Sequence, residues 1–507
     1  MSKEAVIWSV IAVYGVFMLA VGILNSKKSS GMADFTVGGR NAGAWISALS
    51  YGTAYFSAVM FIGYSGGSGW QFGLYSTLVG LGNAIFGSLL AWLVLARRTR
   101  EITRRLKIKS MPQLFETRYQ SSGMRLFSCI VIFIFLLPYS ASVYKGLTSV
   151  CSVLLGIDEQ VCMIVIALAS AFVLVLGGYM ATLKADFVQG IIMMFGVSIL
   201  VLLVVLSPQV GGLSQGIANM REAMRNTGIT PLSGSAVVSL IATILMTSFG
   251  TWGLPQMVHK YYGIRDDKEV KRGTVISTFF AVLVAGGGYF IGSFSHLFFT
   301  ELPQGGKDYL IPNMLNMANL PTILIGVVLV LLISASVSTL SSISLTACST
   351  LSMDLIKNRL KPKLEDKKMA LLTRLLCLLF VVLSYVVANT DTPILELMSY
   401  SWGILSGSFL APYALALYMK RLNRAGAWAG MLGGFLVAAL PVVAKMAIPA
   451  WEAPFGLGLM MNQGPLFACL AMVISAALCI GVSAIAARCG RTQDNSFFYP
   501  KAKQAKA

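Results

Sequence analysis

Charged side chains are scarce in this chain, and the groups that catalysis or metal binding needs are scarcer still. Asp, Glu, Lys and Arg make up 12% of the 507 residues, whereas a soluble domain carries about 25%. The two histidines, His259 and His296, have no Cys, His or acidic cluster around them in the sequence. Because no metal site or nucleophile–base pair is visible, the sequence does not predict an enzyme.

Cysteine occurs eight times, but never as a CxxC pair. Most of these cysteines lie inside apolar runs, where a free thiol behaves as a small hydrophobic group. The spacing therefore predicts neither a disulfide framework nor a zinc site.

Apolar residues dominate the chain instead. They make up 56% of it, and the mean hydropathy is +0.75. A transmembrane helix needs about 20 apolar residues. The first such run is read as a span, not a signal peptide, because it is long, lacks an A-x-A cleavage site and ends at Lys27-Lys28. The sequence predicts an all-α integral membrane protein with about thirteen transmembrane helices, near residues 4–24, 46–67, 71–95, 126–150, 160–178, 187–207, 236–256, 274–298, 320–350, 370–388, 394–419, 425–447 and 465–487.

The basic residues fall unevenly on the two sides of this predicted bundle. With thirteen spans, 33 of the 39 Lys and Arg residues lie on one side, in segments 25–45, 96–125, 184, 257–273, 357–374, 420–424 and 488–507. Cytoplasmic loops are enriched in Lys and Arg, so the amino end is expected outside and the carboxyl end in the cytoplasm of the plasma membrane. The net charge of +19 then faces the inner leaflet and does not indicate nucleic-acid binding.

The number of spans permits an inverted repeat. Spans two to six and seven to eleven are two sets of five, and five is odd, so the second set would enter the membrane with the opposite polarity. In that architecture the first helix of each set is interrupted near the midplane. Both candidate helices carry helix-breaking residues, although glycine is also common in membrane helices that are not interrupted. The expected division is 1–45 (first span and cytoplasmic loop), 46–208 and 236–419 (the repeats), 420–487 (two peripheral spans) and 488–507 (cytoplasmic tail).

Hydroxyl side chains gather in the ninth predicted span. Residues 331–354 contain eleven Ser or Thr. Ala335, Ser338, Thr339 and Ser342 follow the i, i+3, i+4, i+7 spacing that places residues on one helix face. Such a stripe offers uncharged oxygens that replace the water around a small hard cation. The alternative is that small hydroxylated residues allow close helix packing and bond back to their own helix.

Few ionisable residues lie within the spans. Asp186 is predicted either to face a cavity or partner or to cap a helix start. Glu396 is expected at the interface, and Lys145 is expected to extend outward, with a role in solute binding as the alternative. Tyr51, Tyr55, Phe249 and Trp252 are candidates for gates or stacking walls, or for packing.

Motifs spread along the chain match the pattern of a known family. They are residues 34–40 (DFTVGGR) and 48–52 (ALSYG), the Gly177-Gly178 turn before Asp186 and Gln189, Pro255-Gln256, Ala335-x-x-Ser338-Thr339-Leu340-Ser341 with Asp354-Leu355, and Ala416-Leu417 with Arg421, Gly426-Ala427, Gly430 and Gly433-Gly434. On these motifs the chain resembles the sodium/solute symporter family, and within it the sodium/proline symporter branch. The resemblance covers all thirteen predicted spans. It implies a five-plus-five inverted-repeat core of the leucine-transporter type, with one helix before it and two after.

The resemblance also implies two cation sites. The first sodium site would use the backbone carbonyls of Thr53, Phe56 and Ala335 with the hydroxyls of Ser338 and Thr339. A second sodium site, found in some members, would use Asp186 with Ser338, Ser341 and Ser342. Uncharged oxygens suit a monovalent cation, as in carbonyl-lined filters.

The implied solute pocket lies between the two interrupted helices. Its residues would be Tyr55, Ser57, Phe249, Thr251, Trp252, Ser401 and Trp402. The chain departs from the proline branch at Tyr55, where that branch has an aspartate, and at Ala58, where it has a glycine. The solute is therefore left open between an amino acid such as proline and a carboxylate.

We expect a sodium-coupled symporter that imports a small organic solute by alternating access, as a monomer or weak oligomer in the lipid bilayer. Its expected partners are the solute and Na⁺, with no nucleic acid. The alternatives are a solute sensor of the same fold, a channel and a proton-coupled transporter using Asp186. The tail of about 20 residues argues against the sensor, because no signalling domain follows the last span.

Overall fold

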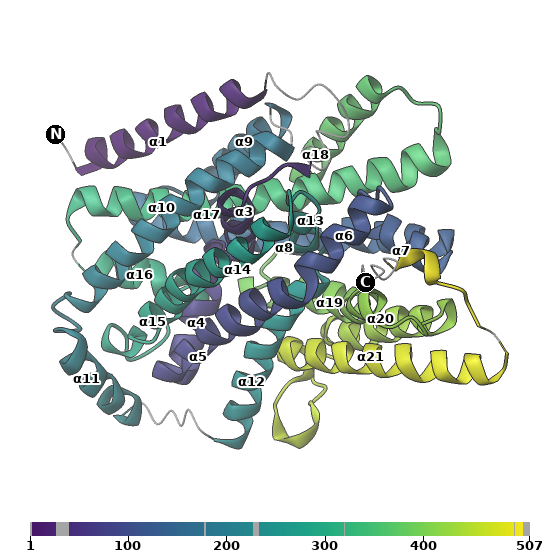
Figure 1. Cartoon of the computed structure of the whole chain (residues 1–507). Helices are drawn as coiled ribbons and strands as arrows, with labels where there is room; N and C mark the ends of the chain where they lie inside the picture. Colours follow the sequence, from purple (N-terminus) through teal and green to yellow (C-terminus); the bar gives the residue numbers. More distant parts are fainter. Residues whose placement is uncertain are drawn as a thin grey trace, which may run out of the picture.

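The chain folds into a bundle of helices. This computed structural model describes residues 3–26, 40–176, 179–226, 233–318, 320–490 and 492–499; residues 34–39 of the first motif and the Gly177-Gly178 turn lie outside the described residues. Figure 1 shows α1 along one edge of the bundle and α20 and α21 along the opposite edge. Up to residue 226 the helices are α1 (Lys3–Ser26), α3 (Ala44–Tyr55), α4 (Ser65–Phe72), α5 (Thr77–Gly82), α6 (Arg97–Arg105), α7 (Met111–Tyr119), α8 (Ser122–Leu155), α9 (Glu159–Leu176), α10 (Tyr179–Val205) and α11 (Leu213–Asn226).

The rest of the chain continues in the same way. Its helices are α12 (Gly234–Phe249), α13 (Pro255–Tyr262), α14 (Asp267–Ala281), α15 (Gly287–Gly292), α16 (Leu310–Met317), α17 (Thr322–Thr350), α18 (Asp366–Ala388), α19 (Ile394–Tyr418), α20 (Arg424–Ala447) and α21 (Gly464–Arg488). Turns of 3-10 or π geometry join several of them, among others η2 (Met60–Tyr64), η4 (Asn83–Leu90), η6 (Gly250–Gly253) and η10 (Leu351–Leu360).

Each predicted membrane segment overlaps helix in the structure. In the described part of the chain, nine helical stretches are long and apolar enough to cross a bilayer. The all-α membrane architecture is therefore confirmed, while the number of thirteen spans and the domain boundaries stay predictions.

Both helices that were expected to be interrupted are interrupted. The first breaks at Phe56, whose extended backbone ends α3 before helix resumes at Ala58. The second breaks where α12 gives way to the short turn η6 and then to the extended Leu254, after which Pro255 starts α13. Pro255 suits this position because the first residue of a helix needs no N–H partner.

The glycines of the first interrupted helix do not cause its break. A Cβ on Gly52 would lie 2.3 Å from the Phe280 ring, and one on Gly69 would lie 1.9 Å from the Gly292 carbonyl oxygen. These glycines lie inside helices and allow neighbouring helices to approach closely.

Helix α17, which carries the hydroxyl stripe, lies at the centre of the bundle. It packs against α1, α3, α8, α10 and α18. From Ser338 to Thr350 every side chain is buried. This packing places the stripe where the interrupted helix α3 can reach it.

Contacts among the Arg- and Lys-rich segments gather at one end of the bundle. Arg104 donates to the carbonyls of Arg265 (2.6 Å) and Arg40 (3.2 Å), and Arg359 donates to the Ser122 carbonyl (3.1 Å). The carboxyl-terminal segment joins them, since Asn495 Nδ2 donates to the Leu422 carbonyl (3.1 Å). Segments that the charge pattern assigned to one side of the membrane therefore contact one another.

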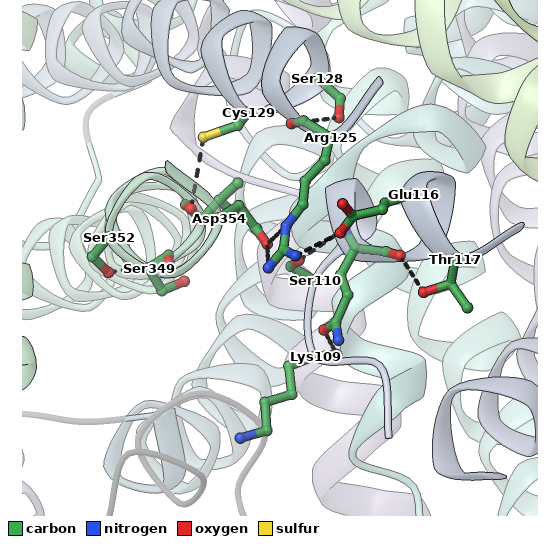
Figure 2. Close-up of polar contacts among 12 residues, drawn as sticks. Lys109, Ser110, Glu116, Thr117, Arg125, Ser128, Cys129, Ser349, Ser352 and Asp354 are labelled. Atoms are coloured by element: carbon green, nitrogen blue, oxygen red, sulfur yellow. Dashed lines mark hydrogen bonds and ion pairs between the residues drawn. The ribbon is translucent and has the colours of Figure 1, made fainter. Parts of the chain in front are cut away.

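An ion-pair network at this same end joins α7 and α8 to η10, the turn that follows α17. Arg125, at the start of α8, donates through Nε to Asp354 Oδ1 on η10 (2.7 Å) and through Nη1 to Glu116 Oε2 on α7 (2.6 Å). Figure 2 shows Arg125 reaching between the two carboxylates. Because the Asp354 side chain is 1% exposed, its charge depends on this partner.

Candidate functional site

The first candidate site forms where α17 meets the end of α3. The Thr339 hydroxyl lies 3.0 Å from the Thr53 carbonyl oxygen and 3.0 Å from the Ala335 carbonyl oxygen. Ser338 Oγ lies 2.8 Å from Thr53 Oγ1. All four residues are buried. The structure thus brings four of the five residues expected at the first sodium site together as uncharged oxygens.

The break in the helix is what frees the Thr53 carbonyl. The last four carbonyls of a helix have no partner within it. At the end of α3 the Gly52 carbonyl accepts from the Phe56 N–H (2.9 Å) and the Ala54 carbonyl accepts from the Tyr139 hydroxyl (3.3 Å). The Thr53 carbonyl faces Thr339 instead. A hydroxyl has one proton, so it donates to only one of the two carbonyls around it, and a cation can satisfy the other.

Phe56, the fifth expected ligand, is placed by its ring. The ring stacks on Tyr55 with centroids 4.1 Å apart and lies 6.3 Å from the Phe280 ring. These ring contacts hold the extended backbone of Phe56 at the break. Phe56 directly follows the last turn of α3, which contains Thr53.

Asp186 lies beside the first site, in the interior of α10. More than one turn of helix precedes Asp186 in α10. The structure therefore excludes the alternative that Asp186 caps the start of a helix. Its Oδ1 accepts from Ser338 (2.6 Å) and its Oδ2 from Ser50 (2.5 Å). Of the other residues expected at a second sodium site, Ser342 also lies here, and Ser341 is buried next to it on α17.

The partner of Asp186 is Lys260, which the charge pattern placed in a cytoplasmic loop. Its ammonium lies 3.1 Å from Asp186 Oδ2, 2.8 Å from Ser50 Oγ and 3.0 Å from Ser342 Oγ. The side chain is 3% exposed. The signal for burial was the aromatic and apolar stretch around it on α13, because a solvated loop lysine seldom sits beside Tyr261 and Tyr262.

Charges in this pocket are paired. A buried ion is tolerated when an opposite charge and hydrogen bonds replace water. The ammonium has three N–H donors, and three oxygens surround it. Within the described residues, no cluster of three or more His, Cys, Asp or Glu side chains could hold a metal ion. The groups gathered here are one carboxylate and several hydroxyls, a set that suits a single positive charge.

Aromatic residues expected at the solute pocket form two groups at the interrupted helices. In the first, the Tyr55 ring lies 6.1 Å from Trp402 on α19, and Tyr139, which the sequence did not single out, meets Trp402 edge-on at 5.7 Å. In the second, Phe249 and Trp252 lie 5.1 Å apart around the break at η6. Because η6 packs against α19, the two groups are neighbours.

The polar groups of this region are partly used by the protein itself. The Tyr55 hydroxyl donates to the Thr247 carbonyl (2.5 Å), Thr251 donates to the Ser248 carbonyl (2.8 Å), and Ser57 Oγ accepts from the Val59 N–H (3.2 Å). Ser401 is fully buried, and its hydroxyl has no hydrogen-bond partner in the described part of the chain. The role of Ser401 in solute binding stays a prediction.

Two cavities lie at the end of the bundle opposite the Arg-rich segments. Their volumes are about 520 and 440 Å³, and Lys307, Pro393 and Leu395 line both. The second also touches Ser399 and Tyr400, the residues before Ser401. Burial raises the pKa of the Asp308 carboxyl in the first cavity, against the opposing effects of the Ile394 N–H and of two lysines.

Lys145 lines the first of these cavities and Glu396 lines the second. Neither residue belongs to the cation pocket around Asp186. Lys145 Nζ donates to the Thr392 carbonyl (2.9 Å), and Glu396 pairs with Lys445 (2.8 Å). The outer position expected for both residues stays a prediction.

Comparison with known proteins gives a consistent picture. The model of the sodium:solute symporter family matches residues 35–434. The chain is 30% identical to the high-affinity proline transporter PutP of Bacillus subtilis (strain 168), over 82% of this chain and 88% of that protein. It is 28% identical to the osmoregulated proline transporter OpuE of the same organism, over 84% and 86%.

A solved structure shows the same fold. The substrate-bound outward-open state of a Na⁺-coupled sialic acid symporter superposes with a TM-score of 0.74, over 95% of this chain and 98% of that chain, at 16% identity. The interrupted helices, the buried hydroxyl stripe and the match of the family model to most of the chain lead to one conclusion: this protein belongs to the sodium:solute symporter family.

Proposed function

We propose that this protein is a sodium-coupled symporter that imports a small organic solute, and that Na⁺ binds between Thr53, Phe56, Ala335, Ser338 and Thr339. Sodium is here a coupling ion carried with the solute, not a resident cofactor. The observation that carries the proposal is the meeting of the Thr53 and Ala335 carbonyls at the Thr339 hydroxyl. Family membership supports it independently.

The coupling follows from the position of this ion. Thr53 lies one turn before the break in α3, and Tyr55 and Ser57 flank the break. An ion that holds the Thr53 carbonyl also holds the backbone that shapes the solute pocket. The membrane potential contributes about 2.3 kcal/mol per charge per 100 mV to inward movement.

For the solute we propose a small amino acid such as proline, or a carboxylate. The curated relatives support it, since both are named proline transporters. Ser401 supplies an unused hydroxyl in the described part of the chain, while Tyr55, Trp402 and Tyr139 supply flat apolar walls. Tyr55 places a phenol where the proline branch has a carboxylate, so an amino group on the solute meets uncharged acceptors there.

We further propose that the Arg-rich end faces the cytoplasm and that residues 46–208 and 236–419 are the two inverted repeats. Positively charged loops favour the cytoplasmic side. In that orientation the cavities around Lys307 open outward, and the Arg125 network closes the inner end.

The test is sodium-stimulated uptake of radiolabelled L-proline by proteoliposomes. The double variant Ser338→Ala, Thr339→Ala should lose this stimulation, because it removes both hydroxyls from the cation site. The matched control is Ser336→Ala, Ser349→Ala, two buried hydroxyls that bond carbonyls of their own helix. It should keep uptake.

A second measurement does not depend on the solute. Sodium that binds only the folded protein raises its stability, by about 2.7 kcal/mol at 100 times Kd. Purified wild-type protein should melt higher in NaCl than in KCl, and the Ser338/Thr339 variant should not. Equal sodium stabilisation of that variant would refute the site.

A further inference from the structure

The Lys260 ammonium occupies a position that a cation could take. It lies within 3.1 Å of three oxygens that come from three different helices: Ser50 on α3, Asp186 on α10 and Ser342 on α17. Lys260 itself is on α13. All four residues are buried.

The oxygens described around Lys260 are acceptors that suit an ammonium donor. An ammonium is a compact point charge with three N–H donors, and the pocket provides a carboxylate oxygen and two hydroxyl oxygens at 2.8–3.1 Å. The remaining carboxylate oxygen, Asp186 Oδ1, accepts from Ser338, which is one of the residues proposed to bind the first sodium ion. The Asp186 charge is therefore already balanced.

We propose that the Lys260 ammonium takes the place of a second coupling cation, so that one Na⁺ and not two accompanies each solute. The inference rests on the proposed function, since it concerns the number of ions in that same cycle. Asp186 and Ser342 are two of the residues expected to bind a second sodium. Here a side chain that cannot leave the protein fills the space between them.

A second sodium would have to displace this side chain. Two positive charges a few ångström apart in a buried site repel strongly, and the three oxygens that would replace the water of the ion are engaged by the ammonium. An ion brings its charge with each cycle, whereas the lysine keeps the same charge permanently. The Asp186 charge therefore stays balanced without a bound sodium ion.

The ammonium also explains how the pocket is held when the first site is empty. Helices α3 and α13 are adjacent parts of the two interrupted helices, and the Ala42 N–H before α3 donates to the Gly263 carbonyl after α13 (3.0 Å). Lys260 joins these two helices to α10 and α17 through a single charged group. The Lys260 ammonium thus holds these helices together permanently, whereas a bound ion would do so only while it occupies the pocket.

The test counts bound ²²Na⁺ per chain at saturation on the purified full-length protein. Wild type should bind one ion. Lys260→Gln removes the ammonium and leaves the Asp186 carboxylate without its counter-charge, so this variant should bind two. The double variant Lys260→Gln, Asp186→Asn removes both charges and should return to one.

The matched control is Lys268→Gln, which removes an exposed lysine in the first turn of α14. It loses the same positive charge as Lys260→Gln, but at a position outside the pocket. It should bind one ion, as wild type does.

The outcomes separate this inference from the proposed function. Two ions per wild-type chain, or one ion on folded Lys260→Gln, would overturn the inference while leaving sodium symport intact. No sodium binding by wild type would instead overturn the proposed function. If Lys260→Gln does not fold, the wild-type count decides, and Lys260→Arg, which keeps the positive charge, should match it at one ion.

Discussion

At the scale of single residues, Tyr55 shows how closely the two interrupted helices are joined. Its hydroxyl donates to the Thr247 carbonyl on α12 (2.5 Å), so a residue at the break of one helix holds the helix that leads into the other break. Gly87 makes this possible, because a Cβ there would lie 2.1 Å from the Tyr55 hydroxyl oxygen. The Tyr55 phenol therefore fits only because Gly87 has no side chain.

This fit predicts coupling between the two positions. Gly87→Ala should lower the free energy of unfolding by about 1–3 kcal/mol, the usual range for overpacking. The loss should be smaller in a Tyr55→Phe background, where the atom in closest conflict is absent. A double-mutant cycle on thermal unfolding measures the difference, and an equal loss in both backgrounds would contradict the fit.

At the scale of helices, glycines on α20 set its distance from α19 and α21. Gly426 and Gly430 face the α21 backbone at Cys479 and Ser475, and Gly434 faces the carbonyl of Gly407 on α19. Their spacing of four residues puts them on one helix face. The family motif that contains them thus has a physical reason, since helices in a membrane associate through close contact of small residues.

The same contacts predict a contrast between two glycines. A Cβ on Gly434 would lie 1.9 Å from the Gly407 oxygen, whereas a Cβ on Gly481 meets nothing within 4 Å. Gly434→Ala should destabilise the protein by about 1–3 kcal/mol, because backbone cannot move aside as a flexible side chain can. Gly481→Ala should be neutral or stabilising. Thermal unfolding in detergent compares them, and similar melting temperatures would argue against this packing.

At the scale of the whole molecule, the bundle separates two ends of different character. The Arg-rich segments contact one another at one end, and the two cavities around Lys307 lie at the other. Because a membrane favours basic loops on the cytoplasmic side, the proposed orientation of the protein follows from this asymmetry.

A native cysteine allows the orientation to be tested. Cys489 follows the last helix and is exposed, whereas Cys129, Cys151 and Cys348 are buried. A membrane-impermeant maleimide should label Cys489 in inside-out vesicles and not in right-side-out ones. The control is Glu452→Cys in a Cys489→Ser background, which should label from the opposite side. Labelling of Cys489 from the outside would reverse the proposed orientation.

The sequence by itself determined the membrane bundle and the hydroxyl face of α17, and it predicted two interrupted helices. These features depend on local properties: the apolar length that crosses a bilayer, a helix-breaking Pro255 and the spacing of Ser338 and Thr339 on one face. Only the tertiary structure decided where the first helix breaks, at Phe56 and not at a glycine, and that Lys260 pairs with Asp186 across 74 positions of the chain. A pairing between distant helices depends on how they pack, and no local pattern of residues carries that information.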